Sequence, residues 1–380
     1  MAAGSSILAS GLPSTDYYAP DYKIEVEGQE IDPESKGDVL ELKVTMDLDN
    51  LTHFDLTVNN WDDKHLAFKY SDTTTFDLGN RVHVQMGYAG GLLSMVQGLI
   101  TSLTPRFPES GPPTLAVGGE DRMVKLKERK PKDGEQKKFV NMTDSDIVQV
   151  IATRNGLVPK IQQTSETHDL VVQKNQDDAA FLMERAKRID YDCFIGVDPD
   201  SGLDALYFQS PTDARDGKKV RMYVLEWGKS LINFNPTLSL NHQVGKVTVK
   251  GWDPTTKKII QYTAGPSDLP SSGGGDNGPS AVQTRLQDRE DIVVDQPVTS
   301  QQEAKALATA LLRERAYRYI TATGQVIGLP DLLPGDNLEL KGLGQRFSGQ
   351  YYVTKVEHTL GGSGYLTSFT VRTYNDGGTK

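Results

Sequence analysis

The sequence predicts a mainly β protein of the α+β class, and two features carry that prediction. Apolar and polar residues alternate with period two in several runs, most clearly in "VLELKVTM" at residues 39–46. Glycine-rich turns such as "DLGN", "PGDN" and "GGSG" separate these runs. Strands that alternate in this way bury one face, and tight turns between them are typical of antiparallel sheets.

The same periodicities place the individual elements. Period-two runs predict strands at 39–46, 54–61, 81–88, 168–174, 191–197, 205–211 and 246–252. Helices are expected at 143–156, 175–189 and 300–319, where apolar residues recur on one face. Thr143 and Asp146 are placed to cap the first helix, Ser300 and Glu303 form a capping-box pattern before the third, and Gly156 ends the first.

Two stretches of the chain resemble each other. "LGNRVHVQMGY" from Leu78 and "PGDNLELKGLG" from Pro334 each place a turn glycine before an alternating strand. A second glycine, Gly98 or Gly349, then opens the next strand, and a further Gly-rich turn and a third strand follow. The pattern fits a duplicated small barrel, and it also fits two unrelated antiparallel meanders. Under either interpretation the glycines serve tight turns, where φ is often positive.

These elements define the expected domains. A first β-barrel is expected over 20–107, with a closing strand at about 112–122, and an α/β insert over 108–225. A second β-barrel is expected from 226–263 and 320–376. Between its two parts lie a flexible Gly/Ser/Pro loop at 264–299 and the long helix at 300–319.

Composition excludes several classes of protein. The chain has 380 residues, 37% hydrophobic, and a formal net charge of −10, which argues against nucleic-acid binding. No uninterrupted apolar run approaches the length of a membrane span, so no stable membrane insertion is expected. The single cysteine, Cys193, lies in an apolar run and is expected to be buried. The basic segment 122–138 is either a solvated loop or a docking surface for an acidic neighbour.

No enzyme site is predicted, so the expected catalytic, cofactor-binding and metal-binding residues are none, and no cofactor is expected. The six histidines are scattered without metal-ligand spacing, and we interpret them as surface or hydrogen-bonded residues. No nucleophile elbow or phosphate-binding loop occurs. Carboxylates are abundant, but their spacing places no two of them across a cleft. The histidines are His53, His65, His83, His168, His242 and His358.

Four phrases in order give the chain a resemblance to a known family. They are "FDLGNRVHVQMGY" with the strand that ends in Asp121 and Arg122, "VQKNQDDAAFLMERAKRIDYD", "VGKVTVKGWDPTTKKII", and "GLPDLLPGDNLELKGLGQRFSGQYYVTKVEH". In the third phrase, Trp252 is expected to be a buried anchor before a turn at Asp253 and Pro254. Over about residues 22–374 the chain resembles the late-control protein D family, hub proteins of contractile phage tails and related injection systems.

The resemblance implies a homotrimeric structural hub with pseudo-six-fold symmetry, which joins a hexameric inner tube protein to a trimeric spike. Larger relatives, the valine-glycine-repeat proteins of type VI secretion, continue into a spike, whereas this chain stops at Lys380. Either the spike is a separate protein, or the native chain continues beyond residue 380; baseplate wedge or LysM-type adaptor proteins are expected as further partners. Assembly in the bacterial cytoplasm, into a released particle or a virion, is also implied. The alternatives are a phage virion tail protein, a peptidoglycan hydrolase and a glycan-binding tail tip.

Overall fold

The computed structural model describes residues 19–377, apart from 128–129, 133–134, 136, 199–200, 202, 212–221, 254–255, 270–274 and 288. The fold is mainly β with several helices, and its largest part is a sheet of thirteen strands. The strand order is β16-β20-β23-β22-β3-β4-β9-β8-β7-β1-β2, and β21 with β15 branches from β22. Neighbours in this sheet are antiparallel except for β15 and β21, so the large antiparallel sheet expected from the alternation is confirmed.

The first part of the chain supplies one half of this sheet. Its inward side chains, among them Leu42, Phe54 and Val84, form one core. The strands are β1 (Pro20–Val26), β2 (Gln29–Glu30), β3 (Val39–Asp47), β4 (His53–Asn59), β7 (Arg81–Tyr88), β8 (Gly91–Arg106) and β9 (Thr114–Asp121). A short helix, α1 (Pro33–Gly37), and a small hairpin, β5 (Trp61–Asp62) with β6 (Ala67–Phe68), lie beside them.

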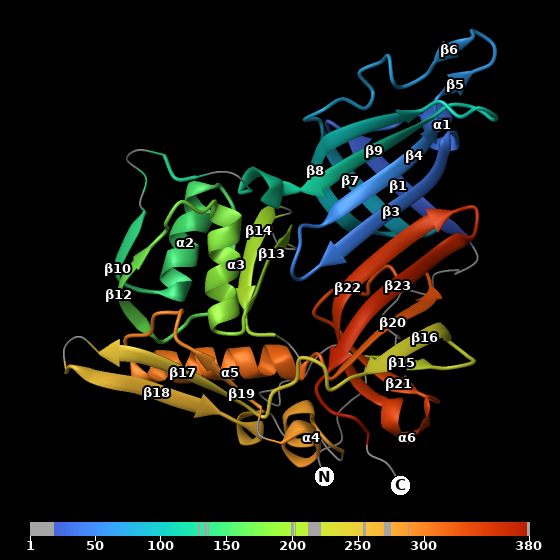
Figure 1. Cartoon of the computed structure of the whole chain (residues 1–380). Helices are drawn as coiled ribbons and strands as arrows, with labels where there is room; N and C mark the ends of the chain where they lie inside the picture. The colour runs from blue at the N-terminus through green and yellow to red at the C-terminus, as the bar shows by residue number, and fades with distance from the viewer. Residues whose placement is uncertain are drawn as a thin grey trace.

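The last part of the chain supplies the other half, with a second core that includes Leu338, Tyr351 and Phe369. Its strands are β15 (Met222–Glu226), β16 (Leu231–Leu238), β20 (Ile320–Ile327), β21 (Asn337–Lys341), β22 (Gly349–Gly361) and β23 (Gly364–Thr373), with α6 (Gly344–Phe347) after β21. The two halves meet where β22 pairs with β3 over Lys355–Gly361 and Glu41–Asp47. Figure 1 shows this junction as red strands beside blue ones.

In the sequence, the segment between β9 and β15 forms a layer of helices and short strands, called the helical layer below. It has its own core around Phe139, Ile147 and Leu182. It contains η1 (Arg122–Lys125), β10 (Lys138–Thr143), α2 (Asp144–Arg154), β11 (Val158–Ile161), β12 (Thr167–Val172), α3 (Asp178–Arg188), β13 (Asp192–Val197) and β14 (Asp204–Gln209). The expected capping box of Thr143 with Asp146 is confirmed at α2. Gly156 follows the helix with φ of 69°.

The strands after β16 correct the expected second barrel. β17 (Lys246–Asp253), β18 (Lys258–Ala264) and β19 (Glu290–Val293) form a separate three-stranded sheet. They do not join the large sheet, because their apolar face packs on α5 (Gln301–Ala316) through residues such as Val247, Val249 and Leu307. Period-two alternation predicts that a strand has a buried face, but it does not identify what covers that face.

The expected loop at 264–299 is also corrected in part. It contains η2 (Pro266–Asp268), α4 (Gly278–Arg285) and β19, and Ala281, Val282 and Val293 are buried. Asn277 caps α4 by accepting a hydrogen bond from the Ser280 amide, which explains how a Gly/Pro-rich stretch starts a helix. Residues 270–274, which include two of the three consecutive glycines of the predicted loop, lie outside the described residues.

Candidate functional site

The buried histidines are hydrogen-bonded, as expected. In the described part of the chain, no group of three or more His, Cys, Asp or Glu side chains is placed to hold a metal ion. His168 lies with its Nε2 3.1 Å from Asp144 Oδ2 and 2.9 Å from an Arg185 amino nitrogen. His358 is fully buried and contacts three polar groups, described below. Both histidines hold elements together.

The cluster around Asp144 ties the helical layer to α5. Arg185 Nε lies 2.5 Å from Asp144 Oδ1, and Arg188 donates to Glu303 Oε1 at 3.0 Å. Burial opposes ionisation of Asp144, but the hydrogen bond from His168 and the charge of Arg185 prevail and lower its pKa. Glu303 belongs to α5 and also accepts from the Thr299 amide, so the expected capping box is only half formed. This cluster of paired charges is a structural joint between α3 and α5.

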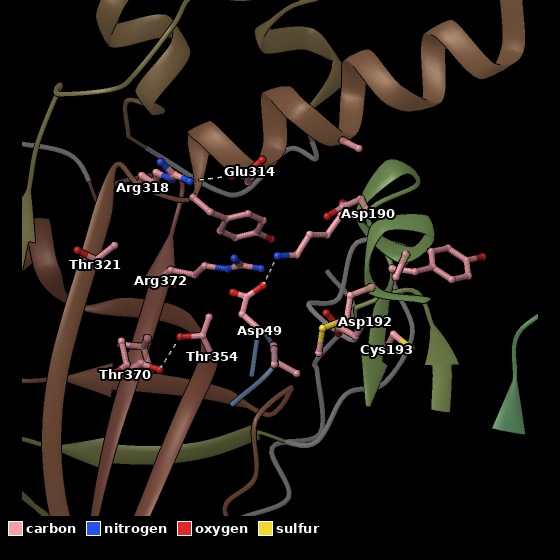
Figure 2. Close-up of a pocket in the computed structure, with 18 residues that line it drawn as sticks. Asp49, Asp190, Asp192, Cys193, Glu314, Arg318, Thr321, Thr354, Thr370 and Arg372 are labelled. Atoms are coloured by element: carbon pink, nitrogen blue, oxygen red, sulfur yellow. Dashed lines mark hydrogen bonds and ion pairs between the residues drawn. The ribbon is translucent and has the colours of Figure 1, made fainter. Parts of the chain in front are cut away.

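The pocket drawn in Figure 2 lies between the helical layer, α5 and the large sheet, with a volume of about 370 Å³. Its polar groups connect its walls. Lys187 Nζ lies 3.0 Å from Asp49 Oδ1. Asp192, which also lines the pocket, accepts a hydrogen bond from the hydroxyl of Tyr352, a residue of the sheet outside the lining, at 2.7 Å. The Arg372 guanidinium lies 4.6 Å from the ring centre of Tyr317. Contacts of this kind fix the helical layer on the sheet, and they assemble no nucleophile with a neighbouring base.

The large sheet contains the same arrangement twice. In the N-terminal unit the order is β3-β4-β9-β8-β7-β1, and in the C-terminal unit it is β16-β20-β23-β22-β21-β15. Each strand of one unit has a counterpart with the same neighbours in the other. One difference is the last strand, because β1 is antiparallel to β7 whereas β15 is parallel to β21.

Two β-bulges occur at matching places, and they fix the register of the repeat. The register shifts between Ile100 and Ser102 in β8, and between Val353 and Lys355 in β22. A second shift lies between Val39 and Glu41 in β3, and between Leu231 and Asn233 in β16. A bulge inserts one residue and bends the strand, so matching bulges indicate two copies of one structure. The internal repeat is thereby confirmed as a repeat of strand order and register.

The turn glycines are equivalent, as predicted. Gly79 and Gly335 have φ of 85° and 92°, and their amides donate to the carbonyls of Ile100 and Val353 at 2.8 Å. Positive φ is easily adopted only by glycine, which explains the shared residue.

The prediction that Gly98 matches Gly349 is wrong by two residues. Val82 pairs with Gly98, and its counterpart Leu338 pairs with Tyr351. Gly98 therefore corresponds to Tyr351. Its role is also different, because a Cβ there would lie 2.2 Å from the Glu120 carbonyl oxygen. Gly349 has open space around its Cα and a φ of 148°. The glycines are out of step because more residues separate Val82 from its partner Gly98 than separate Leu338 from its partner Tyr351.

His358 lies at the junction of the two units, opposite Val44 of β3. Its Nε2 lies 3.2 Å from the Leu332 carbonyl oxygen, and its Nδ1 lies 3.0 Å from the Tyr365 hydroxyl and 3.2 Å from Thr367 Oγ1. Burial lowers the pKa of His358 to about 4. The imidazole therefore connects the loop at Leu332 to strand β23 of the sheet.

Other sequence predictions have mixed outcomes. Cys193 is buried, as expected. Trp252 is 53% exposed, so the prediction of a buried anchor is wrong; its strand turns that residue away from α5. Of the expected turn after it, Pro254 lies outside the described residues. In the basic segment, Arg122 pairs with Asp204, whereas 128–129, 133–134 and 136 lie outside the described residues. None of the helices in the described part of the chain has the length and apolar character of a membrane span.

Solved structures of tail proteins share this fold. The 43 kDa tail protein of prophage MuSo2 from Shewanella oneidensis has a TM-score of 0.69 at 16% identity, over 93% of this chain and 98% of that one. A tail protein from Neisseria meningitidis MC58 has a TM-score of 0.67 at 13% identity, over 94% and 97%. The type VI secretion component c3393 of E. coli has a TM-score of 0.58 at 14% identity, over 94% and 78%. The predicted likeness to tail hub proteins is confirmed as a likeness of fold.

No curated protein matches the chain. The sequence model of the Alg8 N-terminal domain family matches residues 18–361. Since this match takes up most of the chain, the protein belongs to the Alg8 N-terminal domain family, and its fold is that of phage tail proteins.

Proposed function

We propose that this protein is a structural hub of a contractile injection system, in which a homotrimer joins a hexameric inner tube to a trimeric spike. The duplication of the six-strand unit carries the proposal. Three copies of a chain with two equivalent units present six similar units around one axis. Such a ring can match a six-fold partner through its units and a three-fold partner through whole chains.

Two further features support a load-bearing role. Each unit surrounds its own core, and we propose that each closes into a small barrel. The units are joined by the β22–β3 ladder, and the Asp144 cluster and the Figure 2 pocket fix the helical layer to α5 and to the sheet. A body cross-linked in this way transmits thrust without internal hinging. The domain plan is then two barrels, the helical layer, and the α5 layer with β17–β19.

The proposed partners follow from this role. They are two further copies of the chain, the inner tube protein, a separate spike protein, and baseplate wedge or LysM-type adaptor proteins. The c3393 structure is described as a type VI secretion component with similarity to T4 tail proteins gp27 and gp5, and that description supports a place near the spike. The role is non-enzymatic. The particle would be assembled in the bacterial cytoplasm, as a released injection system or as a phage virion, and both settings use the same geometry.

The proposal is tested by mass and by imaging. Light scattering should give three times the chain mass of 41.8 kDa, alone or after addition of the tube or spike protein encoded nearby. Electron microscopy of the native particle should place the chain between tube and spike. A chain that stays monomeric or dimeric with both partners present contradicts the proposal. Zymography on peptidoglycan and a glycan array test the two remaining alternatives, and activity in either would favour that alternative.

A further inference from the structure

Two strand edges lack the neighbour that their counterparts have. In the N-terminal unit, β3 pairs with β4 on one side and β22 on the other. Its counterpart β16 pairs with β20, and within the described residues no strand lies on its other side. In the C-terminal unit, β22 pairs with β21 up to Tyr352, and from Lys355 onward β3 pairs with that same side of β22. In β8 the ladder with β7 ends at Leu99, and no described strand continues along that side at residues 102–106.

We propose that these two edges bind each other between copies of the chain. Residues 233–239 of one copy, at the end of β16 and just beyond it, lie along residues 102–108 of the next copy, at the end of β8 and just beyond it. The arrangement is that of β3 along β22 within one chain. This inference rests on the proposed trimer and specifies its interface. The contact joins two different surfaces, so each copy offers one edge and receives the other. If neighbouring copies are related in space as the two units within one chain are, three chains form a closed ring of six units.

The matching bulges define the register of this contact. Counting from them, β22 residue 357 corresponds to 104 in β8, and β3 residue 45 corresponds to 237 in β16. Because Glu357 faces Thr45 within the chain, Thr104 is expected to face Thr237 of the neighbouring copy. By the same count, Phe107 is expected to face Phe234 of the neighbouring copy.

The burial of side chains supports the proposal that the two edges pair between copies as β3 and β22 pair within one chain. Leu42, Val44 and Met46 of β3 are buried beneath β22 and the core. Their counterparts in β16 are Phe234, Pro236 and Leu238, which are only half-buried. On the other edge, Phe107 is 63% exposed, whereas its counterpart Leu360 is half-buried. Both edges thus present apolar side chains at positions that the intramolecular junction covers, and each has the chemistry to cover the other.

The two edges also carry prolines at matching positions, and these set the strength of the contact. Pro105 corresponds to His358 and Pro236 to Val44, so the register places the two prolines opposite each other. In an antiparallel ladder, hydrogen-bonded and non-hydrogen-bonded residue pairs alternate. Because the Leu48 amide donates to the Thr354 carbonyl, Val44 and His358, four residues further along each strand, also form a hydrogen-bonded pair. Prolines in that position donate nothing, and their rings hold the backbones apart.

The contact between copies therefore depends on side chains and on the outer backbone pairs, and it is weaker than the junction within the chain. Prolines also prevent an open edge from pairing with unrelated strands. A ring that closes only at high concentration, or on its tube or spike partner, is the expected behaviour.

Disulfide trapping tests the register. Thr104→Cys and Thr237→Cys are introduced together in a Cys193→Ala background, and the purified chain is oxidised with copper–phenanthroline at its highest soluble concentration. Pairs of this type bring their Cβ atoms within disulfide reach. The control is Thr45→Cys with Glu357→Cys, whose side chains already meet at 3.5 Å. The control should give a disulfide within one chain, with no increase in mass. The test variant should give a covalent species of three chains, three times 41.8 kDa.

Mixing separates this interface from other possibilities. Chains with only Thr104→Cys, mixed with chains with only Thr237→Cys, should give covalent dimers that contain one of each. Dimers from either single variant alone would indicate a two-fold contact and overturn the proposal. A trimer by light scattering without the Thr104–Thr237 disulfide would overturn this interface and leave the hub function standing. A monomer with tube and spike proteins present, and no disulfide, would overturn both.

Discussion

Replacing His358 by alanine should destabilise the protein strongly, because the imidazole is fully buried and contacts three polar groups. In the variant, the Leu332 carbonyl loses its partner, and the Tyr365 and Thr367 hydroxyls lose an acceptor. A buried polar group left without a partner costs about 1–3 kcal/mol. Since Thr367 keeps the bond from the Leu329 amide, we expect a total loss of about 3–5 kcal/mol, including the void left by the ring.

The pH dependence of stability distinguishes this role from simple packing. Burial lowers the pKa of His358 to about 4 from an ordinary value of 6.5. Between pH 6.5 and about 4, His358 is protonated in the unfolded chain but neutral in the folded chain. The free energy of unfolding therefore decreases as the pH falls through this range. A difference of this size corresponds to about 3 kcal/mol. Asp121 changes stability with pH in the opposite direction, because burial raises its pKa from 3.8 to about 6. Its contribution to the free energy of unfolding therefore decreases as the pH rises from 3.8 to about 6. The wild-type profile therefore contains opposing slopes.

Urea unfolding of the wild type and of His358→Ala, from pH 4.5 to 8, isolates the histidine. The difference in unfolding free energy should be largest above pH 6.5 and should shrink as the pH falls. His242→Asn, at an exposed histidine with φ of 63°, is the control and should unfold like the wild type at each pH. A loss below about 1 kcal/mol, or a difference that does not change with pH, would refute the assignment of His358 as a buried neutral connector.

Other predictions concern single residues. Gly98→Val should prevent folding, since its Cβ would lie 2.2 Å from the Glu120 carbonyl oxygen, whereas Gly349→Val should fold with a lower melting temperature; equal soluble yields and melting curves would contradict this difference. Gly335→Ala should cost about 1 kcal/mol through its positive φ, as measured by urea unfolding, and an unchanged midpoint would contradict it. Cys193, whose pKa burial raises to about 12, should react with a thiol reagent only after unfolding; fast labelling of the native chain would contradict its burial.

Many local features of the fold could be predicted from the sequence. Thr143 caps α2, and Gly79 and Gly335 adopt positive φ, as predicted. The helix expected at 175–189 forms as α3 and buries Phe181 and Leu182 on one face. These features depend on the φ and ψ of a few consecutive residues and on the period of apolar positions, and both are visible in a short window of sequence. The repeat was visible for the same reason, because its turn glycines and alternating strands recur together.

What surrounds each element was decided only in the tertiary structure. The apolar faces of β17 and β18 pack on α5, and Trp252 lies on the exposed side. His358 contacts residues from a loop and from the neighbouring strand β23. The alignment of the second strand of the repeat was also decided there, because more residues separate Val82 from its partner Gly98 than separate Leu338 from its partner Tyr351. The alternation that predicts a strand is the same whether its edge meets β3, another copy of the chain or water. Pairing is chosen by contacts between residues far apart in the chain, so the open edges of β16 and β8 appear only when the two units lie in one sheet.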